Sequence, residues 1–343
     1  MHLGQLFLVG FDGCTLDRSP WLSAALAQGQ LGGVILFDRN VDGSVQNFSS
    51  PAELRRLTAE LRDRAAEPLL IAVDQEGGKV RRLKERDGFP ATRSAAELGK
   101  EPPENTTAQA AAALAATLAE HGITFNLAPV ADLNLNPASP IIARWERSFS
   151  SSAEQAAIHC QAFIEAHRRC GIACCLKHFP GHGSARGDTH LGFVDITHDW
   201  QDIELEPYRL LIAEGCADAI MTAHVTHRGL EPNGLPASLS PAIVTGLLRE
   251  RLGFNGLIVT DDLQMKAVSE QYGYREAVQR AVLAGADLLI VGNNLLRRPD
   301  AHAEGMAAVA ELLEQGLIEE ERIRASLARI AELKEKINGE RTW

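Results

Sequence analysis

Short apolar runs recur along the chain, and segments with the periodicity of amphipathic helices lie between them. The runs lack regular polar alternation, which is typical of strands buried on both faces of a parallel sheet. We therefore expect eight strands, at residues 6–11, 33–37, 69–73, 125–130, 173–176, 219–223, 257–259 and 288–291.

Helical signals follow most of these runs. The segment 51–64 comes after two serines and has Pro51 at the first helical position. The segment 104–120 is rich in alanine, which has a high helix propensity. The segment 319–336 places Ile323, Leu327 and Ile330 on one face and ends in a basic turn that suits the helix dipole. Further helices are expected at 153–169, 201–214, 241–251, 274–284 and 303–315.

This alternation, without a strong linker, favours one (β/α)8 barrel of the TIM type, in the α/β class, over two doubly wound domains. We expect a single catalytic domain over residues 1–343, with no second domain. The alternative is an open doubly wound sheet. Its nucleotide-binding form would carry GxGxxG after the first strand, where this chain has VGFDGC, and no Walker A motif occurs.

Composition narrows the range of functions. The 34 basic and 45 acidic residues give a net charge of −11, which argues against non-specific nucleic-acid binding. The longest nearly apolar stretch, 110–119, has about half the length that a bilayer span needs. The N-terminus lacks the basic region of a signal peptide. The six cysteines form no CxxC pair, as in proteins of a reducing compartment. We expect a cytoplasmic protein that binds neither nucleic acid nor a membrane.

Polar side chains stand at the ends of four predicted strands. The third run ends in Asp74, the fifth in Lys177 and His178, the sixth in His224, and the seventh in an Asp-Asp pair. The chemistry of a TIM barrel gathers at the C-terminal ends of its strands. We therefore expect a functional site at this end.

The loop after the fifth strand carries an acid–base pattern. Asp188 stands two residues before His190, so the carboxylate can fix the imidazole tautomer and raise its basicity. A hydrogen bond that only stabilises the loop is the alternative. At the end of the seventh strand, Asp261 and Asp262 point to opposite faces, so one of them faces the barrel mouth. That carboxylate could be a nucleophile, a base or a metal ligand.

A series of ordered motifs covers roughly residues 5–295: DQEGGKV at 74–80, LAPVAD at 127–132, ERS at 146–148, KHFPGHG at 177–183, DTH at 188–190, MTAH at 221–224, PASLS at 236–240 and TDDLQM at 260–265. Together they resemble the motifs of family 3 glycoside hydrolases, and in particular those of the bacterial β-N-acetylhexosaminidases of peptidoglycan recycling.

The resemblance implies a role for each matching residue. Asp261 would be the nucleophile that forms a covalent glycosyl-enzyme, and His190 the general acid and then base, with Asp188 as its partner. The hydroxyls of the terminal N-acetylglucosamine would be bound by Asp74, Arg82, Arg147, Lys177 and His178. The chain departs from the family at Thr189 and Gln264, where serine is more common, and neither position carries a chemical role.

The implied protein is a retaining exo-β-N-acetylglucosaminidase that uses no metal and no cofactor. Its partner would be a small molecule, an N-acetylglucosaminyl 1,6-anhydro-muropeptide from the cell wall, and it would be a monomer or a weak homodimer. Many family members carry a second α/β/α domain. We expect none here, so the acid must come from the barrel itself.

Two other functions remain open. A metal-dependent barrel hydrolase could use His178, His182, His224 and Asp261 as ligands, although the first strand carries no His-x-His. The other is a sugar-binding barrel without catalysis, which would need neither a nucleophile nor a proton shuttle.

The other polar residues receive structural interpretations. We expect Glu76 to fold back onto Lys79 or Arg81, His182 to brace its loop, and Asp262 to face the barrel wall or a neighbouring helix. His224 either lines the pocket or packs beneath it, and Asp132 either organises the rim or meets substrate. Solvated helix faces are expected for His159, His167 and His302.

Overall fold

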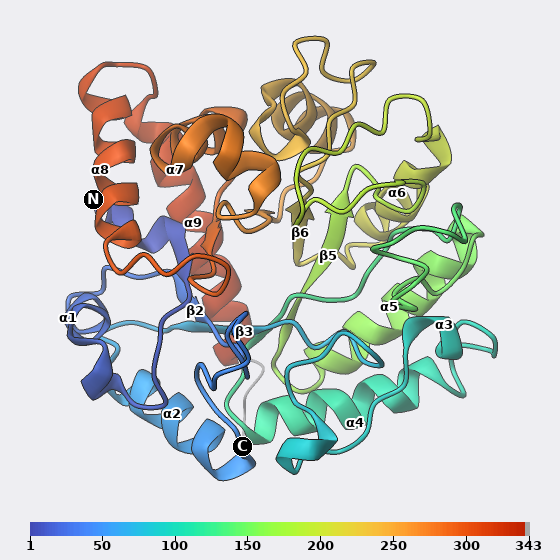
Figure 1. Cartoon of the computed structure of the whole chain (residues 1–343), viewed down its shortest axis with the longest axis horizontal. Coiled ribbons are helices and arrows are strands. Elements are labelled where there is room, and N and C mark those ends of the chain that lie inside the picture. The colour runs from blue at the N-terminus through green and yellow to red at the C-terminus, as the bar shows by residue number, and fades with distance from the viewer. Residues whose placement is uncertain (340–343) are drawn as a thin grey trace.

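The computed structural model describes residues 1–339, in which eight parallel strands form a nearly closed barrel (Figure 1). The strand order is β7-β6-β5-β4-β3-β2-β1-β8, and a bridge between Val259 and Leu288 brings the two ends together. The predicted TIM-type barrel is thus confirmed. The strands are β1 Phe7–Val9, β2 Gly33–Ile35, β3 Leu70–Val73, β4 Phe125–Asn126, β5 Ala173–Phe179, β6 Ala219–Thr222, β7 Leu257–Thr260 and β8 Leu289–Val291.

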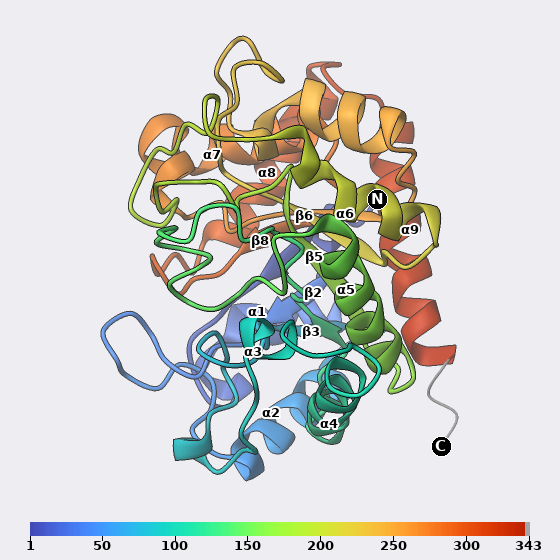
Figure 2. The same ribbon diagram turned by 90° about the vertical axis from the view of Figure 1, so that its right-hand side faces the viewer.

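Helices surround the strands (Figures 1 and 2). The α-helices are α1 Pro20–Ala27, α2 Pro51–Arg64, α3 Ala95–Leu98, α4 Thr107–Glu120, α5 Ala153–Arg168, α6 Glu206–Ala213, α7 Lys266–Ala284, α8 Ala301–Glu314 and α9 Glu320–Gly339. Shorter or tighter turns are η1 Leu3–Leu6, η2 Leu16–Arg18, η3 Glu85–Asp87, η4 Asp202–Leu205 and η5 Ala237–Leu239, and η6 Ala242–Arg251 is π-helical.

Helix α2 shows how the local sequence sets these elements. The hydroxyl of Ser50 accepts a hydrogen bond from the backbone N–H of Glu53, and Pro51 occupies the first turn. Leu54, Leu57 and Leu61 lie on one face and are buried against the barrel.

The structure differs from the predicted elements in several places. Helices α1 and α3 were not predicted. Helix α7 begins at Lys266, eight residues earlier than expected, because a bend at Gly273 joins two helical segments. Strand β4 is shorter than predicted, since Pro129 has no N–H to donate to a ladder, whereas β5 continues through Lys177 and His178.

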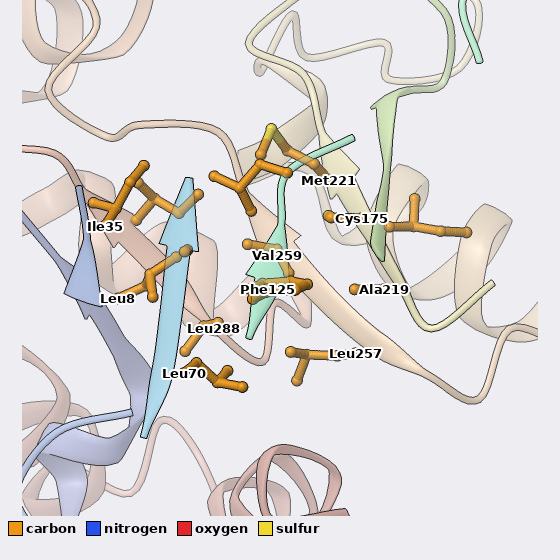
Figure 3. Close-up of a cluster of buried hydrophobic side chains, with 14 of the residues drawn as sticks. Leu8, Ile35, Leu70, Phe125, Cys175, Ala219, Met221, Leu257, Val259 and Leu288 are labelled. Atoms are coloured by element: carbon orange, nitrogen blue, oxygen red, sulfur yellow. The ribbon is translucent and has the colours of Figure 1, made fainter. Parts of the chain in front are cut away.

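The barrel interior is a packed core and not a pore. Figure 3 shows side chains from different strands meeting there, among them Leu8, Leu70, Phe125 and Val259, all fully buried. This packing closes the barrel from within, so any ligand site must lie at an end of the barrel.

The N-terminal ends of the strands are held by buried carboxylates. Asp287, just before β8, accepts hydrogen bonds from Arg249 of η6 and from Ser326 of α9. Lys336 and Lys334 of α9, the long red helix in Figure 2, reach Asp218 before β6 and Gln5 before β1. Hydrogen bonds from α9 therefore stabilise this end of the barrel.

Three histidines correct a sequence-based expectation. His159, His167 and His302 are buried and not solvated. His167 bonds the carbonyl of Phe163 and the amide of Asn126, and His159 bonds the hydroxyl of Thr107. Helical periodicity alone did not reveal these partners. Thr107 and Asn126 belong to other elements, and Phe163 lies one turn earlier in the same helix as His167.

The six cysteines are free thiols, and four of them are buried. Within residues 1–339, no helix combines the length and apolar character needed to cross a bilayer.

Candidate active site

A cavity of about 340 Å³ opens at the C-terminal ends of the strands. That volume is in the range of small-molecule sites. The residues to which the family resemblance gave a role all line it: Asp74, Arg82, Arg147, Lys177, His178, Asp188, His190 and Asp261. Strand β5 and the loops after β3, β4, β5 and β7 thus bring them to one place. His224, just after β6, is not among the lining residues.

An interlocked group of ions, here called the floor, consists of Asp74, Glu76, Arg147 and Lys177. The ammonium of Lys177 lies 2.8 Å from Asp74 Oδ1 and 2.8 Å from Glu76 Oε1. Arg147 binds Glu76 through two parallel hydrogen bonds of 2.8 Å. Each ion is therefore paired with a side chain from another segment of the chain.

Glu76 corrects the sequence analysis, which paired it with Lys79 or Arg81. Its actual partners, Arg147 and Lys177, are 71 and 101 residues away in the sequence. Burial acts to raise the pKa of Glu76, but the two cations outweigh it and hold the pKa well below its ordinary range. Glu76 is thus a permanent anion that orients Arg147 and Lys177.

Asp74 stays ionised for the same reason. Burial acts to raise its pKa, but the positive charges of Lys177 and Arg82 outweigh burial, so the pKa lies below its ordinary value. Arg82 Nη2 lies 3.2 Å from Asp74 Oδ2. The two carboxylates in turn raise the pKa of Lys177. The floor therefore presents fixed charges that can form charge-assisted hydrogen bonds to sugar hydroxyls.

The loop after β3 can hold these residues only because of its glycines. Gly78 has φ +56°, and a Cβ there would lie 2.4 Å from the Cβ of Ser94. The side chain of Gln75 accepts the backbone N–H groups of Arg82 and Leu83, which ties the two ends of the loop together. Arg82 is thereby returned to the vicinity of Asp74.

His178 is oriented by a buried carboxylate. Its Nδ1 lies 2.7 Å from Asp132 Oδ2, and its Nε2 lies 3.2 Å from Arg147 Nη2. The network assigns the proton to Nδ1, so Nε2 accepts from Arg147. Asp132 also accepts the backbone N–H of His182 and is not among the cavity-lining residues. Asp132 therefore orients the end of β5 and the loop that follows it, and does not meet the cavity itself.

The loop after β5 is braced from below by Glu204. This buried carboxyl accepts hydrogen bonds from the Ser184 hydroxyl and the backbone N–H of Gly183, and burial raises its pKa to about 7. Gly183 cannot be replaced without a shift, because a Cβ would lie 1.8 Å from the carbonyl oxygen of Leu133.

The same loop places Asp188 and His190 on the cavity, as a contacting pair. His190 Nδ1 lies 2.8 Å from Asp188 Oδ1. Burial acts to lower the pKa of His190, but the hydrogen bond to Asp188 and the charge of Asp261 raise it above its ordinary value. An imidazole of this kind can hold a proton near neutral pH.

Asp261 and Asp262 have different surroundings. Burial acts to raise the pKa of Asp261, but His224, His178 and His190 lower it, so this carboxylate is ionised. Asp262 Oδ1 accepts the backbone N–H groups of Gln264 and Gly292, and burial raises its pKa to about 6. The expectation that only one of the two faces the barrel mouth was therefore wrong: Asp262 lines the cavity too, because its hydrogen bond to Gly292 holds it at the end of the adjacent strand β8.

Two of the four residues weighed as metal ligands, His178 and His224, are engaged otherwise, whereas the ring nitrogens of His182 are buried without a hydrogen-bond partner and do not line the cavity. Both ring nitrogens of His178 and both of His224 have partners, the latter being the Ser238 hydroxyl and the Asp262 carbonyl. Among the described residues, no group of three or more His, Cys, Asp or Glu side chains is arranged to hold a metal ion.

A parallel barrel with a carboxylate, a His–Asp pair and fixed charges around one cavity has the features of a barrel hydrolase. The glycosyl hydrolase family 3 N terminal domain matches residues 2–333. The chain belongs to this family and is a glycoside hydrolase, as the motifs predicted.

Individual relatives agree. A β-hexosaminidase of Tolumonas auensis is 39% identical over 297 residues, which cover 85% of this chain and 84% of that protein. A glycoside hydrolase family 3 β-N-acetylglucosaminidase from Paenibacillus sp. str. FPU-7 superposes with a TM-score of 0.89 at 36% identity. That match covers 98% of this chain and 62% of the Paenibacillus chain, so this chain spans less than two thirds of it. A β-N-acetylhexosaminidase from Beutenbergia cavernae has a TM-score of 0.83 at 31% identity and is covered to 97%, as is this chain.

Proposed function

We propose that this chain is a retaining exo-β-N-acetylhexosaminidase that removes a terminal β-linked N-acetylglucosamine. One observation carries the proposal: Asp261, His190 and Asp188 share a single cavity with the interlocked ions of the floor. The names of the β-hexosaminidase relatives support the choice of sugar.

In the first step, Asp261 attacks the anomeric carbon while His190 donates its proton to the glycosidic oxygen. Because Nδ1 of His190 is bonded to Asp188, Nε2 is the nitrogen left to carry the transferable proton. The bond to the leaving group breaks, and a covalent glycosyl-enzyme forms on Asp261.

In the second step, neutral His190 removes a proton from water, which attacks the same carbon and releases Asp261. Two inversions give net retention. Retaining glycosidases usually pair two carboxylates about 5 Å apart. An imidazole in place of the second carboxylate avoids like-charge repulsion, so Asp261 stays ionised without a raised pKa.

The floor and its neighbours would bind the terminal sugar. Asp74 can accept hydrogen bonds from hydroxyls, whereas Lys177 and the Arg82 guanidinium can donate them. Arg147 adds donors beside them, and His178, which accepts from Arg147 through Nε2, lines the cavity next to it. We further propose that the natural substrate is a cytoplasmic 1,6-anhydro-muropeptide, from the motif resemblance, and that the single barrel acts as a monomer or weak homodimer.

The stereochemistry of the product tests the proposal. The chain should hydrolyse an aryl β-N-acetylglucosaminide, and proton NMR should detect the β-anomer of N-acetylglucosamine before mutarotation. Initial release of the α-anomer would contradict a covalent intermediate. No turnover would instead support a sugar-binding barrel. Release of N-acetylglucosamine from a purified anhydro-muropeptide tests the natural substrate separately.

Asp188→Asn should move the alkaline limb of the kcat/KM profile to lower pH. His190 must be protonated in the first step, and Asp188 helps to raise its pKa, so activity falls as pH rises through that pKa. Without the carboxylate the pKa drops, and kcat at neutral pH should fall by about 100-fold. Asp199→Asn, which alters a carboxylate bound to Arg186 on the same side of the barrel, should leave the limb in place. An unshifted limb in Asp188→Asn would overturn the proton-shuttle role.

Chelators should leave the rate unchanged. The candidate ligands His178 and His224 are already hydrogen-bonded at both nitrogens, and the proposed mechanism uses no metal. The assay compares initial rates before and after dialysis against EDTA, with zinc added back. Loss of activity that zinc restores would favour the metal-dependent hydrolase.

A further inference from the structure

Two exposed apolar side chains stand at the opening of the cavity, and the proposed mechanism does not use them. Trp145 is 42% exposed and Leu295 is 40% exposed, yet both line the same cavity as the floor. We call this pair the apolar rim. Large apolar groups left partly in water at a ligand site commonly contact a ligand.

The two rim residues lie on opposite sides of the barrel. Trp145 follows β4 and Leu295 follows β8, and these strands are four positions apart in the eight-stranded order. A group that leaves the cavity through its opening therefore passes between them.

The position of Trp145 is fixed on both sides along the chain. The ammonium of Lys79 lies 2.6 Å from Glu146 Oε1 and 3.4 Å from the carbonyl oxygen of Arg144. The backbone carbonyl of Glu146, a residue with φ +58°, accepts the N–H of Ala96. The segment 144–147 thus places Arg147 in the floor and Trp145 at the opening of the cavity.

Polarity changes from the floor to the rim. The floor consists of buried ions suited to the hydroxyls of the terminal sugar, and the rim is apolar. His190 protonates the oxygen that joins the terminal sugar to the leaving group. In the bound substrate, His190 must therefore lie beside that oxygen, with the terminal sugar on one side and the leaving group on the other. The leaving group then lies on the side of the rim.

We propose that Trp145 and Leu295 form the binding site for the leaving group and select a second pyranose ring there. This inference rests on the proposed function. The C–H groups on one face of a pyranose give it an apolar surface, and a flat indole with a negative face packs against such polarised C–H groups. Leu295 covers the ring from the other side.

The test compares two substrates that differ only beyond the scissile bond: the β-1,4-linked disaccharide of N-acetylglucosamine and methyl β-N-acetylglucosaminide. Trp145→Ala and Leu295→Ala should each lower kcat/KM for the disaccharide by about tenfold, mainly through KM. Hydrolysis of the methyl glycoside should change by less than about twofold, because methanol is too small to reach the rim.

Two further variants make the result specific. Trp145→Phe keeps an aromatic face and should recover most of the disaccharide activity. Leu317→Ala removes an exposed leucine in the turn between α8 and α9 and should affect neither substrate. Equal losses on both substrates in Trp145→Ala, or no loss on the disaccharide, would overturn the inference. Failure of the wild type on both substrates would instead refute the proposed function.

Discussion

Replacing Asp261 with alanine should lower kcat by about 10⁴-fold or more, because no other group would bond to the anomeric carbon. Neighbouring imidazoles lower the pKa of Asp261, so it is ionised and available for attack across the working pH range. The measurement is hydrolysis of an aryl β-N-acetylglucosaminide, with thermal unfolding to verify that the variant is folded.

Added azide makes this prediction specific to a covalent mechanism. Azide can enter the space left by the carboxylate and attack the anomeric carbon, so Asp261→Ala should form the α-glycosyl azide. Asp262→Asn is the matched control. Its side-chain oxygen can still accept the N–H groups of Gln264 and Gly292, so kcat should change by less than about tenfold. Equal losses in both variants would show that the pair acts structurally.

Lys177→Met should destabilise the fold by about 3–5 kcal/mol, because it leaves buried carboxylates without a shared cation. The affected groups are Asp74 and Glu76, each 2.8 Å from the ammonium. Lys266→Met removes an exposed cation 3.8 Å from Glu270 and should cost less than about 1 kcal/mol. Urea unfolding at neutral pH measures both values.

The pH dependence separates this charge effect from lost packing. The pKa values of Asp74 and Glu76 are depressed in the folded chain, so their stabilisation is present above about pH 4 and is lost as pH falls towards the folded-state pKa values. The difference between wild type and Lys177→Met should therefore narrow in acid. A difference that stays constant with pH would mean that Lys177 acts through packing alone.

The sequence predicted the strands well because each is buried on both faces and reads as an apolar run. The convergence of strand ends in a barrel predicted the place of Asp74, Lys177, His178 and Asp261, and the loop after the fifth strand predicted that of Asp188 and His190. Arg82 and Arg147 were assigned only from the family resemblance. What the sequence could not supply were partners distant along the chain. Nothing near Glu76 indicates Arg147, and the buried partners of His159 and His167 lie on other elements or within a helix turn. Trp145 carried a signal that was overlooked, a large aromatic residue directly before the ERS motif.

The pairing of β1 with β8 has a consequence for biosynthesis. Leu8 of β1 pairs with Ile290 of β8. Strand β1 is synthesised first, and one of its two edges stays unpaired until β8, the last strand, has been synthesised. Lys334 then fastens Gln5 from α9. A nascent chain that stops short of residue 289 would expose unpaired edges on β1 and β7, which are sites for mispairing. Protection of the N-terminal third during synthesis therefore matters more for this protein than for one whose neighbouring strands are consecutive in the chain.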